Sequence, residues 1–123
     1  PRGQHVCVEP FNKWSKPSIL LVNEGNYSDG HGFPYGYRTL GLGKIIGMPI
    51  PGTMTLVWWE TQQDPTLVFG IPQMGIKANN GQYLEHQQLE PDTRVENDPN
   101  KLLQGIDQQL EQAVRELLKE INQ

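Results

Sequence analysis

The sequence predicts an α/β fold, and three observations support this prediction. Two short apolar runs, at residues 18–22 and 44–50, are each bounded by turn-forming residues. Continuous apolar runs of this length have no solvated face and are typical of buried strands. The segment 31–41 between them is long enough for a helix, and residues 107–121 show apolar residues at helical spacing. Both element types therefore alternate along the chain.

The first three elements form a predicted strand–helix–strand unit, with strands at 18–23 and 44–50 around the helix at 31–41. Such units have parallel strands and a right-handed connection. Their ligands gather at the carboxyl ends of the strands. Ser28 follows the first strand at that end, so the sequence indicates this edge of the sheet as a candidate site.

The middle of the chain predicts further strands. Residues 53–59 are rich in β-branched and aromatic side chains, and residues 66–72 form a second candidate that runs on toward residue 77. The Asn79-Asn80-Gly81 sequence predicts a turn before a short strand at 83–85. Trp58 and Trp59 could line a substrate groove, although packing in the core or at a sheet edge is the favoured use.

Two helices are predicted at the end of the chain. Asp98 and Pro99 begin the first, which Gly105 ends, and Asp107 caps the second. One face of the second helix is apolar and the other is charged, so it should dock on the parent sheet or on a neighbouring subunit. The apolar face consists of Leu110, Ala113, Val114, Leu117, Leu118 and Ile121.

Composition excludes several classes of protein. The net charge is −4 with no basic stripe, so nucleic acid is a poor candidate partner. No apolar run reaches the length of a membrane span, and the polar first residues do not resemble a signal peptide. The single cysteine, Cys7, permits no intrachain disulfide and is expected to be a buried small hydrophobe. Because the chain lacks an initiator Met, we expect a piece of a longer polypeptide.

Ser28 has two possible roles at the predicted strand–helix junction. Serine is a preferred helix N-cap, and the local pattern by itself favours that role. A serine there can also be a nucleophile, because the unpaired N–H groups of the first helical turn would meet an oxyanion formed on an attacked substrate. The segment 26–28 also fits a glycosylation sequon, which we discount because it adjoins a buried strand.

The stretch around Ser28 is longer and more ordered than a helix cap requires. It reads Leu-Val-Asn-Glu-Gly-x-x-Ser-Asp-Gly over residues 21–30, followed by Phe33, Arg38 and the run 40–44. This pattern resembles the nucleophile region of tricorn-type and C-terminal-processing (tail-specific) serine peptidases. The resemblance implies that Ser28 is the nucleophile and that the Asp29 N–H contributes to the oxyanion hole. The family usually carries an acidic residue where this chain has His31.

A second informative stretch runs over residues 85–95. Taken alone, it is typical of a solvated loop, and it lacks the ligand clustering of a metal site. Beside the same family it is similar to the tricorn-type motif Glu-Asn-x-Gly-Val-x-Pro-Asp, which Glu85, Pro91 and Asp92 match. The resemblance implies that Glu85 supports the catalytic histidine through an intervening hydroxyl group. The family's Asn, Gly and Val are replaced here by His86, Gln88 and Leu89.

A serine hydroxyl needs a positioned base to act as a nucleophile. C-terminal-processing peptidases use a lysine at a position that corresponds to Thr53, while Lys44 lies too early in this chain. The resemblance therefore favours the tricorn-type solution, a histidine from a region far upstream. That region and the Asn-x-Gly-Gly segment with the second oxyanion donor are not in this chain. His31, three residues after Ser28, is a weaker candidate because a general base also requires an orienting partner.

The resemblance extends from about Trp14 to the last helix and implies a crotonase-like (ClpP-like) layered α/β fold, present here in part. We expect the carboxyl-terminal portion of a serine peptidase catalytic domain, with a connector at 1–17, the sheet and nucleophile helix at 18–97, and the terminal helices at 98–123. The rest of the parent chain would supply the base. Peptides or unfolded proteins would be the substrates, a homo-oligomer is compatible with the apolar helix face, and no cofactor or metal is implied.

Two alternatives stay open. The chain could belong to a catalytically inactive member of the same fold that serves as a binding or oligomerisation module. It could also be a small interaction domain that uses the Trp58–Trp59 face and the helix at 107–121. The resemblance leaves the compartment open between the bacterial periplasm or cell envelope and the cytoplasm. Without its base, the isolated chain should hydrolyse peptides poorly or not at all.

Overall fold

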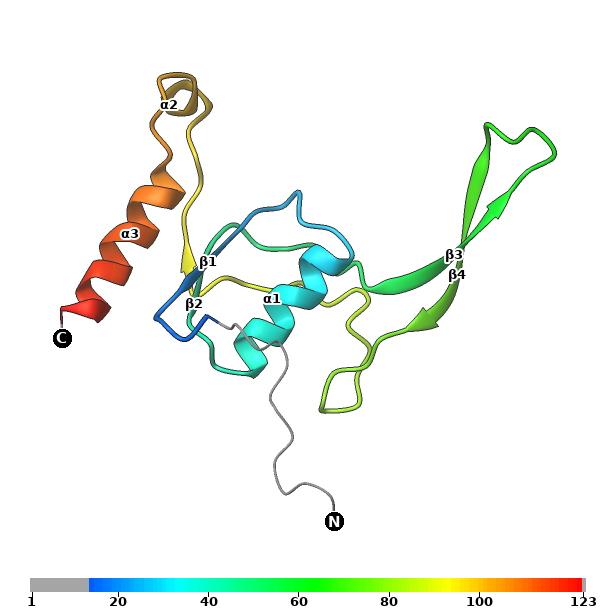
Figure 1. Ribbon diagram of the computed structural model, residues 1–123, viewed down its shortest axis with the longest axis horizontal. Helices are drawn as coiled ribbons and strands as arrows, with labels where there is room; N and C mark the ends of the chain where they lie inside the picture. The colour runs from blue at the N-terminus through cyan, green and yellow to red at the C-terminus, as the bar shows by residue number, and fades with distance from the viewer. Residues whose placement is uncertain (1–13, 123) are drawn as a thin grey trace, which may run out of the picture.

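The protein is mixed α/β, as the sequence predicts. The computed structural model describes residues 14–122, so Cys7 and most of the predicted connector at 1–17 lie outside the described residues. Within these residues, the fold consists of a three-stranded sheet, a separate two-stranded hairpin and three helices (Figure 1). In chain order, the elements are β1 (Ile19–Val22), α1 (Asp29–Thr39), β2 (Lys44–Gly47), β3 (Thr55–Thr61), β4 (Val68–Gly75), β5 (Thr93–Arg94), α2 (Pro99–Leu103) and α3 (Gln108–Ile121).

The three-stranded sheet has the order β1-β2-β5, and both of its pairings are parallel. The predicted strand–helix–strand unit is confirmed as β1–α1–β2, with Ile19 opposite Lys44 and Val22 opposite Gly47. The central strand carries Ile45 and Ile46, which are fully buried, because the continuous apolar run has no solvated face.

Gly47 lets β1 and β2 approach each other at the end of the pair. Its φ is +136°, and a Cβ at this position would lie 1.8 Å from the carbonyl oxygen of Val22. No other residue fits without moving the backbone of one strand. The Met48 N–H donates to the same Val22 oxygen at 3.0 Å, so the close approach also satisfies a backbone group.

Helix α1 covers the sheet through a small apolar core. Tyr37 of α1 packs with Val22 and Ile45 of the sheet and with Ile50 and Leu89 of the following loops. The loop that contains Leu89 is tied to the sheet by Asp92, whose carboxylate accepts a 2.7 Å hydrogen bond from the Ile45 N–H and forms a 3.2 Å ion pair with Arg38 of α1. A second core of Met54, Ala78 and Leu84 joins this unit to the base of the hairpin.

The antiparallel β3–β4 hairpin projects away from the sheet as a separate arm (Figure 1). Trp58 and Trp59 lie on this arm with exposed fractions of 59% and 64%. Of the two favoured uses, packing in the core is therefore wrong, while a position at a sheet edge agrees with the two-stranded hairpin. Leu67, Val68 and Phe69 near the hairpin tip are also exposed, so the arm presents apolar side chains that the described residues do not cover.

The two predicted C-terminal helices are confirmed with their caps. The Asp98 and Asp107 carboxylates accept hydrogen bonds from the Asn100 N–H and the Leu110 N–H, at 2.8 Å and 3.0 Å. Helix α3 packs on β1 and β2, on the side away from the hairpin (Figure 1).

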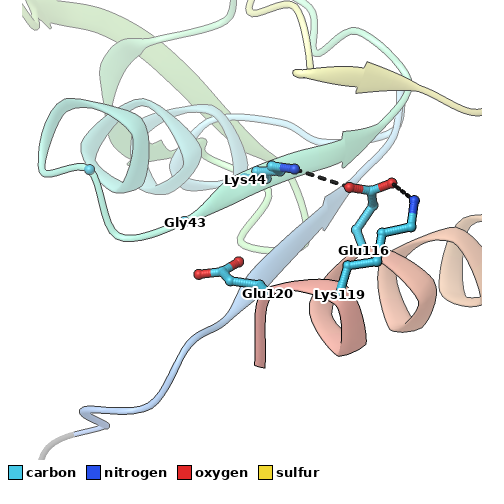
Figure 2. Close-up of a pocket in the computed structure, with 6 residues that line it drawn as sticks. Gly43, Lys44, Glu116, Lys119 and Glu120 are labelled. Atoms are coloured by element: carbon cyan, nitrogen blue, oxygen red, sulfur yellow. Dashed lines mark hydrogen bonds and ion pairs between the residues drawn. The ribbon is translucent and has the colours of Figure 1, made fainter. Parts of the chain in front are cut away.

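The predicted apolar face of α3 divides into two parts. Ala113 is buried and Leu117 is half-buried, while the other members, Leu110, Val114, Leu118 and Ile121, are exposed. Ion pairs also connect α3 to the sheet (Figure 2). Lys44 at the start of β2 forms a 3.0 Å ion pair with Glu116 of α3, which also pairs with Lys119 at 3.2 Å. These pairs are solvent-exposed and contribute little stability.

Two details differ from the sequence prediction. The expected strand at 83–85 is a single bridge between Tyr83 and Lys77, followed by a turn. Strand β5 was not expected, because two residues give no periodicity, and it forms only through pairing with β2. No helix in the described part of the chain is long and apolar enough to cross a membrane.

We predict that Gly47→Ala lowers the free energy of unfolding by roughly 2–4 kcal/mol, because the new methyl group meets the Val22 carbonyl and the positive φ is strained. Chemical denaturation measures this change. The matched control is Gly36→Ala in α1, where an added Cβ meets nothing within 4 Å. The control should raise stability by up to about 1 kcal/mol; equal losses in both variants would contradict the prediction.

Candidate active site

Ser28 lies in a strained turn between β1 and α1. Its φ is 54° and its ψ is −112°, and its side chain makes no capping hydrogen bond. The capping role that the local pattern favours is therefore wrong. A positive φ at a non-glycine residue costs about 1–3 kcal/mol and persists where the surroundings impose it. A sharp strand-to-helix turn of this kind presents a serine hydroxyl at the edge of a sheet.

The turn before Ser28 is built by asparagine side chains. The Asn26 Oδ1 accepts from the Asn23 N–H at 2.8 Å, and the Asn23 Oδ1 accepts from the Gly25 N–H at 2.9 Å. Short polar side chains that bond to nearby backbone are typical of tight turns. The Asn26 Nδ2 also donates to the Gly30 carbonyl at 3.0 Å, which ties the turn to the first turn of α1.

The first N–H of α1 belongs to Asp29, and it donates no hydrogen bond within residues 14–122. The next two amides are already used: Gly30 donates to the Tyr27 carbonyl and His31 to the Ser28 carbonyl, both at 2.8 Å. The Asp29 N–H is thus a free donor directly after Ser28, at the positive end of the helix dipole. It can donate a hydrogen bond to an oxyanion that develops beside the serine and so stabilise the negative charge.

The segment 53–55 links Ser28 to Glu85. The Thr53 Oγ1 accepts from the Ser28 N–H at 3.4 Å, which is a long hydrogen bond. The Met54 N–H and the Thr55 hydroxyl both donate to the Glu85 Oε2, at 2.6 Å and 2.8 Å. The structure therefore brings Ser28 and Glu85, which are far apart in the sequence, to the same three-residue segment.

Glycine at position 52 permits this approach. A Cβ on Gly52 would lie 2.3 Å from the Gln87 backbone nitrogen, so only glycine lets the two loops touch. The His86 N–H donates to the Gly52 carbonyl at 2.8 Å, and His86 itself has a φ of 62°. The loop that follows Glu85 is thus folded tightly against the residues before β3. It does so although this chain has Gln88 where the tricorn-type motif has a glycine.

The electrostatics of the site favour an ionised Glu85. Hydrogen bonds from the Thr55 hydroxyl and then the Met54 N–H hold the pKa of Glu85 below its ordinary value, while partial burial acts in the opposite direction. Burial lowers the pKa of His31, and the nearby Glu85 carboxylate opposes this effect. An anionic Glu85 and a neutral His31 are therefore the favoured states near neutral pH.

His31 is closed off from solvent. Its exposed fraction is 1%, and its Nδ1 has no hydrogen-bond partner among the described residues. No hydrogen bond joins its side chain to Ser28 in that part of the chain. Within residues 14–122, His31 therefore has no hydrogen bond from Nδ1 to an orienting partner and none to the Ser28 hydroxyl, which weakens it further as a base for this serine.

A cavity of about 480 Å³ opens beside the start of α1. Its wall is mostly apolar, and Asp29, the residue after Ser28, is part of it. The other residues that define it include Phe33, Tyr35, Met54, Ile76 and Leu84. Apolar cavities with a few polar groups are the usual binding sites for small ligands and side chains.

Sequence reasoning named Ser28, Asp29 and Glu85 but assigned no role to Thr55. A threonine at the start of a predicted strand carries no signal beyond β propensity, so only the tertiary contact identifies it. Asp92, which matches the resembling motif, is used structurally: its carboxylate binds the Ile45 N–H and Arg38.

We predict that Glu85→Gln destabilises the protein more at pH 7 than at pH 3.5. The pKa of Glu85 is lower in the folded protein, so its carboxylate contributes stability above the unfolded-state pKa, about 4.3, and loses it as the pH falls through the folded-state pKa. Denaturant titrations at both pH values measure the difference.

The control for this experiment is Glu60→Gln, an exposed residue of β3 whose carboxylate accepts no hydrogen bond among the described residues. It should change stability by less than about 0.5 kcal/mol at either pH. A Glu85→Gln loss that grows as the pH falls would contradict the assigned hydrogen bonds.

The sequence is related to known proteases. Residues 3–95 match peptidase family S41. The chain is 27% identical over 122 residues to the tricorn protease of Thermoplasma acidophilum, covering 98% of this chain and 11% of that protein. It is also 27% identical over 122 residues to the tricorn protease of Thermoplasma volcanium, covering 98% of this chain and 12% of that protein. The chain thus spans little more than a tenth of these relatives' length.

Solved structures give the same result. The crystal structure of the tricorn protease superposes with a TM-score of 0.81 at 27% identity, covering all of this chain and 12% of that one. Mature CPAF gives a TM-score of 0.60 at 22% identity, covering 69% and 16% of the two chains, and shows likeness in fold alone. Because the family match spans residues 3–95 of 123, the chain belongs to peptidase family S41.

Proposed function

We propose that this chain carries the nucleophile and the supporting carboxylate of a serine endopeptidase, as the carboxyl-terminal portion of a catalytic domain whose remaining part supplies the base. The observation that carries the proposal is the turn at Ser28. Ser28 has a strained backbone and no side-chain capping bond, and the Asp29 N–H donates no hydrogen bond within the described residues. The Ser28 N–H also contacts Thr53, in the short segment that binds Glu85. Similarity to the tricorn proteases supports the same conclusion.

The chemistry follows from these groups. The Ser28 Oγ attacks the peptide carbonyl carbon while its proton passes to the base, and the carbonyl oxygen becomes an oxyanion that the Asp29 N–H stabilises. Collapse expels the amine, which takes the proton, and leaves an ester on Ser28. Water then hydrolyses this acyl-enzyme by the same route. The ionised Glu85 stabilises the protonated base through an intervening hydroxyl group.

The cavity beside Asp29 is the proposed site for an apolar substrate side chain, because the residue after the nucleophile lines it and its wall is mostly apolar. The layered arrangement is proposed to be the crotonase-like type, completed by residues outside this chain. The three segments at 1–17, 18–97 and 98–123 are proposed to be the connector, the catalytic core and the docking helices of that domain. Peptides or unfolded proteins are the proposed substrates, and a homo-oligomer is the proposed assembly.

A second candidate function is a catalytically inactive module for binding or oligomerisation. It is favoured by the exposed apolar side chains of the β3–β4 arm and of α3, including Trp58, Trp59 and Leu118. Surfaces of this kind mark contacts with other protein. An interaction module needs no activated serine, so the reactivity of Ser28 separates the two functions.

We predict that the full-length protein reacts with a fluorophosphonate probe at Ser28 and hydrolyses unfolded protein. Ser28→Ala should abolish the labelling and lower kcat by at least about 10³-fold, because the acyl-enzyme cannot form. Mass spectrometry of the labelled protein and a peptide hydrolysis assay measure these changes. The isolated chain should show neither activity, since it lacks the proposed base.

The matched control is Ser15→Ala, an exposed serine outside the site, which should leave labelling and kcat unchanged. Absence of labelling in folded full-length wild type would support the inactive module instead. Turnover by the isolated chain that depends on Ser28 would show that the base lies within these residues.

A further inference from the structure

Only one oxygen of Glu85 is used by the described part of the chain. The Oε2 accepts both the Met54 N–H, at 2.6 Å, and the Thr55 hydroxyl, at 2.8 Å. Within residues 14–122, no hydrogen bond of good geometry reaches the Oε1, and the Thr55 N–H is only the smallest of the influences that lower the pKa of Glu85. Two donors on one oxygen restrict the orientation of the carboxylate and leave the acceptor capacity of the other oxygen available.

Thr55 is well placed to hold this orientation. It is the first residue of β3 and is paired in the ladder with Gly75 of β4, so its backbone is fixed. The side chain is half-buried, and a β-branched residue has few χ1 rotamers, so the direction of its hydroxyl is restricted. The Thr53 Oγ1, two residues earlier, accepts from the Ser28 N–H. The same short segment therefore contacts both proposed catalytic residues.

We propose that Thr55 is a positioning residue of the active site: its hydroxyl, with the Met54 N–H, holds the Glu85 Oε2 so that the Oε1 faces the group that completes the catalytic relay. This inference rests on the proposed function. Thr55 does not touch the reacting atoms; it acts through Glu85.

The charged and titratable surroundings of Glu85 agree with this role. His86, the next residue in the chain, is the titratable group that lowers the pKa of Glu85, and Glu85 in turn raises the pKa of His31 of α1. Of all the influences on the pKa of Glu85, the Thr55 hydroxyl is the largest, and it favours the ionised form. Loss of the hydroxyl therefore removes a donor that the Met54 N–H alone does not replace.

The test uses the full-length protein with Thr55→Val and Thr55→Ser, and with Thr61→Val as the matched control at the exposed end of the same strand. Thr55→Val should lower kcat by about 10- to 100-fold with KM unchanged, and should slow fluorophosphonate labelling of Ser28 by a similar factor. Thr55→Ser keeps the hydroxyl and should stay within about threefold of wild type. Thr61→Val should match wild type. If Thr55→Val does not fold, the same measurements are made on Thr55→Ala, which adds no bulk.

The outcomes separate this inference from the proposed function. Wild-type protein that neither labels nor turns over would overturn both. Active wild type with equal kcat in Thr55→Val and Thr61→Val would overturn the positioning role alone. Equal losses in Thr55→Val and Thr55→Ser would also overturn it, because the methyl group rather than the hydroxyl would then be responsible. A loss restricted to folded variants without the hydroxyl, and confined to kcat, supports the role.

Discussion

The parallel contact between β1 and β2 is the constraint on which the rest of the structure depends. Gly47 lies so close to the Val22 carbonyl that no side chain fits between the strands. Strand β1 ends at this contact, and the chain then leaves the sheet through the turn built by Asn23 and Asn26, in which Ser28 has a positive φ. The free energy that the strained conformation costs is offset by the stability of the sheet and of α1 on either side of the turn. The Asp29 N–H, the first of α1, donates no hydrogen bond within residues 14–122, as is usual for the first amides of a helix.

Two carboxylates of the loop after the hairpin complete this arrangement. Asp92 binds the Ile45 N–H and so attaches the loop to the central strand, while Glu85 binds the segment before β3. Both are carboxylates that accept backbone N–H groups, which is a strong type of hydrogen bond in a partly buried setting. Asp92 thereby joins α1, the sheet and the loop, whereas Glu85 contacts the same segment, 53–55, that accepts the Ser28 N–H. The same chemistry therefore attaches both ends of the loop to the rest of the fold, and at Glu85 it also underlies the proposed function.

Exposed apolar side chains occur on the β3–β4 arm and on α3, two elements that lie at opposite ends of the molecule (Figure 1). Both elements form without covering these surfaces: the hairpin by its own ladder and α3 by its caps and its contacts with the sheet. Exposed apolar area of this kind is typical of protein contacts. Their position is consistent with a chain that spans little more than a tenth of the length of its protease relatives.

Local patterns in the sequence determined the α/β class, β1, α1, β2, the hairpin strands and both capped helices. Those elements follow from apolar runs, helical spacing and capping residues, all of which act over a few neighbours. Motif resemblance also singled out Ser28, Asp29 and Glu85. Only the tertiary structure decided that β5 exists, that Trp58 and Trp59 are exposed, and that Thr55 binds Glu85. These features depend on residues distant in the chain, and neither periodicity nor propensity carries information about such contacts.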